Sequence, residues 1–227
     1  MISHQHKCIF IHITKCAGSS IESAFGIDIS NISSSNNKNL FGWNDEHKLY
    51  LQHATPQQLL DYGFISKKIW DEYYKFVIVR NPWERTVSDY IWMMAAIKKV
   101  DSFKNYILRN GKFKEVLTDK DSEAYRGDHL NRQKDYFRYN GNDLIYDNII
   151  RMEDINTGLT KVIADLSLSN DFFNRKVNIS KKNYGHYSQF YNAKKKRLFE
   201  SVFSEDIDFL NYKYEDRKKG IKKYIPF

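Results

Sequence analysis

Two loops carry residue types that bind anions. The first spans residues 15–20 of KCIFIHITKCAGSS (7–20), where a lysine, a glycine and two serines follow an apolar run. The second begins at Arg80 of YKFVIVRNPWERTVS (74–88), where another apolar run leads through Asn-Pro to Ser88. Backbone N–H groups at the start of a helix, together with Lys or Arg, favour bound phosphate. Two such loops in one small domain predict a ligand with phosphates at both ends.

Each loop needs a strand before it and a helix after it. Residues 7–13 and 74–80 are mostly apolar or β-branched, which is typical of buried strands. Helices are predicted over 18–26 and from Pro82 to about Ala96, since proline suits a helix start. Further elements are predicted as short helix 56–62, strand 144–152, and helices 154–166 and 187–203.

Strands that alternate with helices predict an α/β fold, with a mostly parallel central sheet flanked by helices. Ligands of such sheets bind at the carboxyl ends of the strands, where both loops fall. The first loop is not a P-loop of the nucleotide triphosphatase kind, because Lys15 precedes Gly18 instead of following a glycine directly. At 227 residues, we expect one domain over 1–227, with a basic tail over about 216–227.

The segments HITKCAGSSI (12–21) and RNPWERTVSDY (80–90) resemble the PAPS-dependent sulfotransferases, in particular the branch that sulfates glycan hydroxyls. The first departs from the family pattern, with Thr14 in place of proline and Cys16 in place of threonine, but it keeps the lysine and the hydroxyl pair. YLQHATPQQLL (50–60) resembles the stretch that supplies the family's catalytic histidine. The resemblance covers most of the chain and is weakest over 27–45 and 97–127. It implies the sulfotransferase fold, which is P-loop-like.

The resemblance also implies a donor, 3′-phosphoadenylyl sulfate (PAPS), a product, adenosine 3′,5′-bisphosphate (PAP), and no metal. Lys15 would stabilise the leaving group, and Arg80 and Ser88 would bind the 3′-phosphate. The 5′-phosphate would lie on Cys16, Ala17, Gly18, Ser19 and Ser20. Two alternatives stay open for Asn178, Ser180 and Lys182: they close over the nucleotide, or they belong to a surface loop.

A histidine suits the task of taking the acceptor's proton, because its pKa lies near neutrality. Of seven histidines, His53 matches the family's base, with His47 in reserve. His12 points from a strand, so we expect it to be packed or hydrogen-bonded. No His/Cys/Asp set has the spacing of metal ligands.

The acceptor is expected to be a carbohydrate hydroxyl, on a surface polysaccharide or a lipid-linked oligosaccharide. Aromatic and polar residues suit the groove that would hold it, and Arg132 and Gln133 match a family stretch that faces the sugar. The candidates are Trp43, His47, Lys48, Trp92, Arg132 and Gln133. The sequence leaves the acceptor's identity and the oligomeric state open.

Composition bounds the setting of the protein. Most of the net charge of +8 lies in residues 171–227, which hold fourteen Lys/Arg and seven Asp/Glu. Such a surface attracts polyanions, although a solvated face or a loosely packed tail explains it equally well. The apolar runs are too short to cross a bilayer. We expect no signal peptide ahead of the first strand. With two cysteines, expected as free thiols, and an Asn/Lys/Ile-rich composition, we expect a cytoplasmic and bacterial protein.

Two other function classes stay open. A nucleotide-dependent phosphotransferase could use the same strand–loop–helix site, but the P-loop order and an evident magnesium-binding carboxylate are both missing. A non-catalytic protein that binds polyanions or nucleic acid would explain the basic last quarter. It would not need both anion loops and His53, and we find no nucleic-acid-binding motif.

Overall fold

The computed structural model describes residues 1–33, 35–122, 124–174 and 184–218. Its contacts divide the chain into two compact units. The first unit comprises Met1–Arg80 and Asp135–Ile179, and the second comprises Asn81–Lys134 and Ser180–Phe227. Each unit is therefore built from two separate stretches of chain. That residues 1–227 work as one domain stays a prediction.

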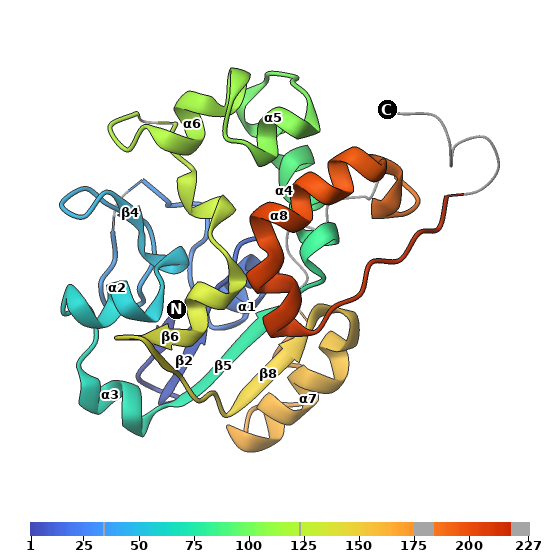
Figure 1. Cartoon of the computed structure of the whole chain (residues 1–227). Coiled ribbons are helices and arrows are strands. Elements are labelled where there is room, and N and C mark those ends of the chain that lie inside the picture. The colour runs from blue at the N-terminus through green and yellow to red at the C-terminus, as the bar shows by residue number, and fades with distance from the viewer. Residues whose placement is uncertain (34, 123, 175–183, 219–227) are drawn as a thin grey trace. The chain divides into compact units, whose positions relative to one another are not determined.

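The first unit contains a four-stranded sheet in the order β1-β2-β5-β8 (Figure 1). Strands β2 (Cys8–Ile11), β5 (Tyr74–Val79) and β8 (Asn148–Arg151) run parallel, while β1 (Ile2–Ser3) pairs antiparallel with β2. The predicted α/β fold with a mostly parallel sheet is confirmed.

The central strands are apolar because both of their faces are covered. Every residue of β2 is buried, and Phe10 packs on Phe76 of β5 with ring centroids 5.0 Å apart. Helix α7 (Ile155–Asp165) packs on β8, and it approaches closely because Gly158 has no side chain. A Cβ atom at that position would lie 2.3 Å from Ile150.

Short elements complete the first unit. Helix α2 (Pro56–Asp61) starts with the capping box that the sequence suggests: Thr55 accepts from the Gln58 N–H, and Gln58 accepts from the Thr55 N–H. The remaining elements are α1 (Gly18–Ala24), α3 (Lys67–Glu72), the hairpin β3 (Trp43–Asn44)–β4 (Leu49–Tyr50) and the hairpin β6 (Arg138–Tyr139)–β7 (Asn142–Asp143).

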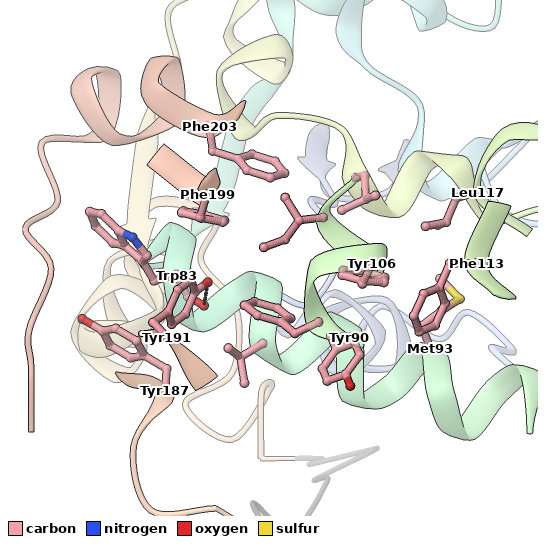
Figure 2. Packing of buried hydrophobic residues seen from close by; sticks show 14 of the residues in the cluster. Trp83, Tyr90, Met93, Tyr106, Phe113, Leu117, Tyr187, Tyr191, Phe199 and Phe203 are labelled. Carbon is pink, nitrogen blue, oxygen red and sulfur yellow. Dashed lines mark hydrogen bonds between the residues drawn. The ribbon is translucent and has the colours of Figure 1, made fainter. Parts of the chain in front are cut away.

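The second unit is helical and surrounds an aromatic-rich core, which Figure 2 shows. Inside it, the Tyr191 hydroxyl donates to the backbone oxygen of Trp83 at 3.1 Å, so a buried polar group has its partner. Its helices are α4 (Pro82–Ile97), α5 (Phe103–Ile107), α6 (Lys114–Thr118) and α8 (Ala193–Leu210).

Two predicted elements have different bounds. The helix expected over 187–203 is a short 3-10 helix, Tyr187–Phe190, followed by α8. The helical conformation is interrupted before Asn192, which is the N-cap of α8. Its side chain accepts the Lys195 N–H at 2.8 Å. The strand expected over 144–152 is the shorter β8. The expected helices near 18–26, 56–62, 82–96 and 154–166 are confirmed as α1, α2, α4 and α7.

Candidate active site

The first anion loop joins β2 to α1 in a tight turn. Lys15 and Ala17 have φ values of 64° and 62°, a left-handed conformation that costs energy for residues other than glycine. The Cys16 N–H donates to the Ile13 oxygen at 3.2 Å, and the Ser20 N–H donates to the Ala17 oxygen at 3.0 Å. These two N–H groups are thus engaged in the turn. The binding of the 5′-phosphate by residues 16–20 stays a prediction.

Arg80, the first residue of the second loop, contacts the first loop at the carboxyl ends of β2 and β5. Arg80 follows directly after β5, and its Nη1 donates to the Lys15 backbone oxygen at 3.0 Å. Strands β2 and β5 are parallel neighbours, so their carboxyl ends lie side by side (Figure 1). Arg80 is only 7% exposed, which strengthens its bond to the loop. The expectation that both loops fall at the carboxyl ends of strands is confirmed.

Helix α4 carries Ser88, which is half-buried and belongs to the second unit. The side chain of Asn81 caps this helix by accepting the N–H groups of the next turn. Arg85 is buried and donates to the backbone oxygens of His129 and Asn131. The role of Ser88 in binding phosphate stays a prediction.

His53 closes the 3-10 helix Leu51–His53, just ahead of α2, where the sequence places it. It is half-buried, and its backbone oxygen accepts the Tyr136 hydroxyl at 3.0 Å. Its ring meets the ring of His12 edge-on, with centroids 4.6 Å apart and planes at 81°. His53 and Lys15 belong to the same unit.

His12 is packed and hydrogen-bonded, as expected. It is 5% exposed, and its Nδ1 lies 2.8 Å from Oε1 of Glu22, which is 1% exposed. Glu22 is not among the residues that the sequence motifs single out. The available signal was Glu22 itself, an acidic residue directly after Ile21 on the buried side of α1, because a buried histidine needs a polar partner.

The acceptor candidates are distributed over both units. In the first unit, the ring of Trp43 packs on that of Tyr50, with centroids 4.9 Å apart. The ring of His47 stacks on that of Tyr62, with centroids 4.1 Å apart. Nζ of Lys48 forms an ion pair with Oδ1 of Asp45 at 2.8 Å. In the second unit, Trp92 stacks on His129 and Arg132 pairs with Glu205. Gln133 is fully buried, and its N–H donates to Asp206, which gives it a structural role; its contact with an acceptor stays a prediction. Asn178, Ser180 and Lys182 lie outside the described residues.

The second unit holds another buried histidine–carboxylate pair, to which the sequence analysis gave no role. His129 is 5% exposed, and its Nδ1 lies 2.7 Å from Oδ1 of Asp89 on α4. Nothing in the sequence near His129 signals this pair, because forty residues separate the two partners.

The family of the chain follows from a match to a protein-family model. A model of the sulfotransferase family matches residues 1–216. The chain belongs to the sulfotransferase family. It is therefore an enzyme of sulfonate transfer. No curated protein matches this sulfotransferase, and no solved structure does. Within the described part of the chain, no helix combines the length and the apolar character needed to span a membrane.

Proposed function

We propose that this sulfotransferase moves a sulfonate from PAPS to a hydroxyl of a carbohydrate acceptor. The observation that supports the proposal is the hydrogen bond from Arg80 Nη1 to the Lys15 backbone oxygen. This bond joins the two loops that we expect to bind anions, at the carboxyl ends of β2 and β5. A donor with a 5′-phosphosulfate and a 3′-phosphate has the two anionic ends that such a pair of loops suits.

The donor's two ends go to different loops. The 5′-phosphate lies on the N–H groups of Ala17, Gly18 and Ser19 at the start of α1, together with the hydroxyls of Ser19 and Ser20. Arg80 binds the 3′-phosphate, since a guanidinium forms paired, charge-assisted hydrogen bonds with phosphate. That Ser88 takes part in binding phosphate stays a prediction from the family resemblance.

The reaction is an in-line displacement at sulfur. The acceptor oxygen forms a bond to sulfur while the bond from sulfur to the bridging phosphate oxygen breaks, and PAP leaves with the electron pair. His53 takes the proton from the acceptor hydroxyl. Lys15 stabilises the negative charge that grows on the leaving oxygen, an interaction that is stronger in the transition state than in the ground state.

Two further points belong to this proposal. Trp43, His47 and Lys48 are the first-unit residues that we assign to the acceptor. Cys8 and Cys16 are both free thiols, which supports a reducing, cytoplasmic setting.

A thermal-shift titration tests the donor. PAP at about 100 times its Kd stabilises a protein by about 2.7 kcal/mol. For a chain of this size, that raises Tm by about 5–10 °C. ADP and ATP with magnesium are titrated in parallel. Arg80→Ala should lose the response to PAP, whereas Arg138→Ala should keep it, because Arg138 is an exposed arginine paired with Asp143. Radiolabelled PAPS with a panel of glycans then identifies the acceptor.

The other outcomes of this titration are informative. Stabilisation by ATP with magnesium alone would favour a phosphotransferase. No response to any nucleotide would refute the proposed donor and leave the basic surface to be explained by a polyanion partner, whose binding weakens steeply with salt.

A further inference from the structure

His12 lies where three parts of the proposed site meet, although the reaction as written gives it no task. Its ring contacts Glu22 of α1, Gly18 of the anion loop and His53, all within the first unit. Phe10 of β2 lies beside it, with ring centroids 5.9 Å apart and planes at 23°. A side chain held on so many sides has little freedom to turn.

The bond to Glu22 fixes the orientation of the ring. Both partners are almost fully buried, and Nδ1 lies 2.8 Å from Oε1. Leaving a buried carboxylate without its partner is costly, so this bond resists rotation of the imidazole. Glu22 lies one helical turn after Gly18, so the same helix that begins at the anion loop also holds the histidine.

The ring also sets how closely the loop backbone approaches β2. A Cβ atom on Gly18 would lie 2.0 Å from both Nε2 and Cδ2 of His12. The imidazole therefore occupies the space that any side chain at position 18 would need. The position of the ring and the position of the loop's central glycine depend on each other.

Contacts support both the backbone and the ring of His53. Its backbone oxygen accepts the hydroxyl of Tyr136, and its ring rests against the ring of His12. The first contact holds the backbone, and the second limits the rotation of the imidazole. A general base must stay within hydrogen-bond reach of its proton, and a displacement of about 1 Å can cost 10²-fold in rate.

We propose that His12 is a positioning residue: fixed by Glu22, its ring holds both the anion loop at Gly18 and the ring of His53 in the geometry that transfer requires. The inference rests on the proposed function, because it takes Lys15 and His53 as the reacting groups. In this proposal, His12 couples the donor loop to the base, which neither Lys15 nor His53 does alone.

Two substitutions separate the ring from the hydrogen bond. His12→Asn keeps a donor for Glu22 but lacks the ring that touches His53. His12→Phe keeps a ring but lacks the donor. His4→Asn is the matched control, because His4 is an exposed histidine bonded to the Tyr73 hydroxyl. For each protein, the thermal midpoint, the kcat per PAP-binding site and the KM for PAPS are measured. Carbon relaxation NMR on histidine-labelled protein gives the order parameter of the His53 ring.

We expect a crossed pattern. His12→Asn should keep a thermal midpoint close to that of the wild type, while kcat falls about 10²-fold and the order parameter of the His53 ring drops. His12→Phe should lower the thermal midpoint below that of His12→Asn, while its kcat should fall less than that of His12→Asn. If His12 had only a structural role, its substitution would lower the thermal midpoint and leave kcat per PAP-binding site unchanged. His4→Asn should change none of these quantities.

The inference is overturned if His12→Asn retains the wild-type kcat and an unchanged order parameter for His53. It is also overturned if the KM for PAPS rises while kcat stays constant, because that would limit His12 to donor binding. The order parameter needs no substrate. If the wild type binds no PAP and transfers no sulfonate, the proposed function fails, and the order parameter still decides whether His12 positions His53.

Discussion

Gly18→Ala gives the sharpest steric test of the loop geometry. The added Cβ would lie 2.0 Å from Nε2 and Cδ2 of His12, whereas carbon atoms pack at about 3.5–4.0 Å. The ring would have to move by more than about 1 Å. Such a shift would lengthen the bond between His12 and Glu22, now 2.8 Å, beyond hydrogen-bond range.

The opposing contributions can be compared. Overpacking of a filled site costs about 1–3 kcal/mol, and a buried carboxylate left without its hydrogen bond costs a further 1–3 kcal/mol or so. Alanine is the better helix former by up to about 1 kcal/mol, which offsets part of this loss. A net loss of about 3 kcal/mol in the free energy of unfolding corresponds to a fall in Tm of about 6–12 °C.

Urea denaturation and calorimetry measure this loss, and PAP titration measures the accompanying loss of affinity. Ser23→Ala serves as the control, since it lies on the same helix and should stay within about 0.5 kcal/mol of the wild type. Combining Gly18→Ala with His12→Asn should be less harmful than the sum of the two, because the smaller side chain makes room for the methyl group. Wild-type stability in Gly18→Ala, or strict additivity in the double variant, would refute the reasoning.

Three further outcomes are expected. Lys15→Ala should lower kcat by about 10²–10³-fold with an unchanged melting temperature, measured with radiolabelled PAPS; a wild-type rate would remove Lys15 from the leaving-group role. His53→Ala should lower kcat by about 10²–10⁴-fold in the same assay while PAP affinity is kept, and unimpaired turnover would point to another base. Asp206→Ala removes a fully buried carboxylate that accepts two backbone N–H groups at 2.9 Å. It should cost about 2–4 kcal/mol in urea denaturation, whereas the exposed Asp208→Ala should cost little.

The main elements of the fold were predictable because their signals are local. The strand before Lys15 and the strand before Arg80 are short apolar runs, and α2 carries its capping box in the sequence. The bounds of α8 were not predictable in the same way. Its expected end, residue 203, coincides with a kink, where Phe203 has φ −117° and ψ 22°, yet the helix continues to Leu210.

The site divides along the same line. Lys15, Arg80 and His53 can be picked out from motifs, and their roles stay predictions. Glu22 offers a possible polar partner for a buried histidine, but only the fold brings Glu22, His12 and His53 together. Contacts of this kind depend on strand order and helix packing, which no local pattern encodes.

The interleaving of the two units has a consequence for synthesis on the ribosome. Strand β5 pairs with β8, but the stretch 81–134, which belongs to the second unit, is made between them. At about 5–20 residues per second, roughly 70 residues separate the two strands by about 4–14 seconds. During that interval the apolar FVIV segment of β5 lacks one of its two neighbouring strands, β8, and an unpaired apolar edge favours aggregation. We therefore expect the yield of soluble enzyme to depend on chaperones and on translation speed across residues 81–147.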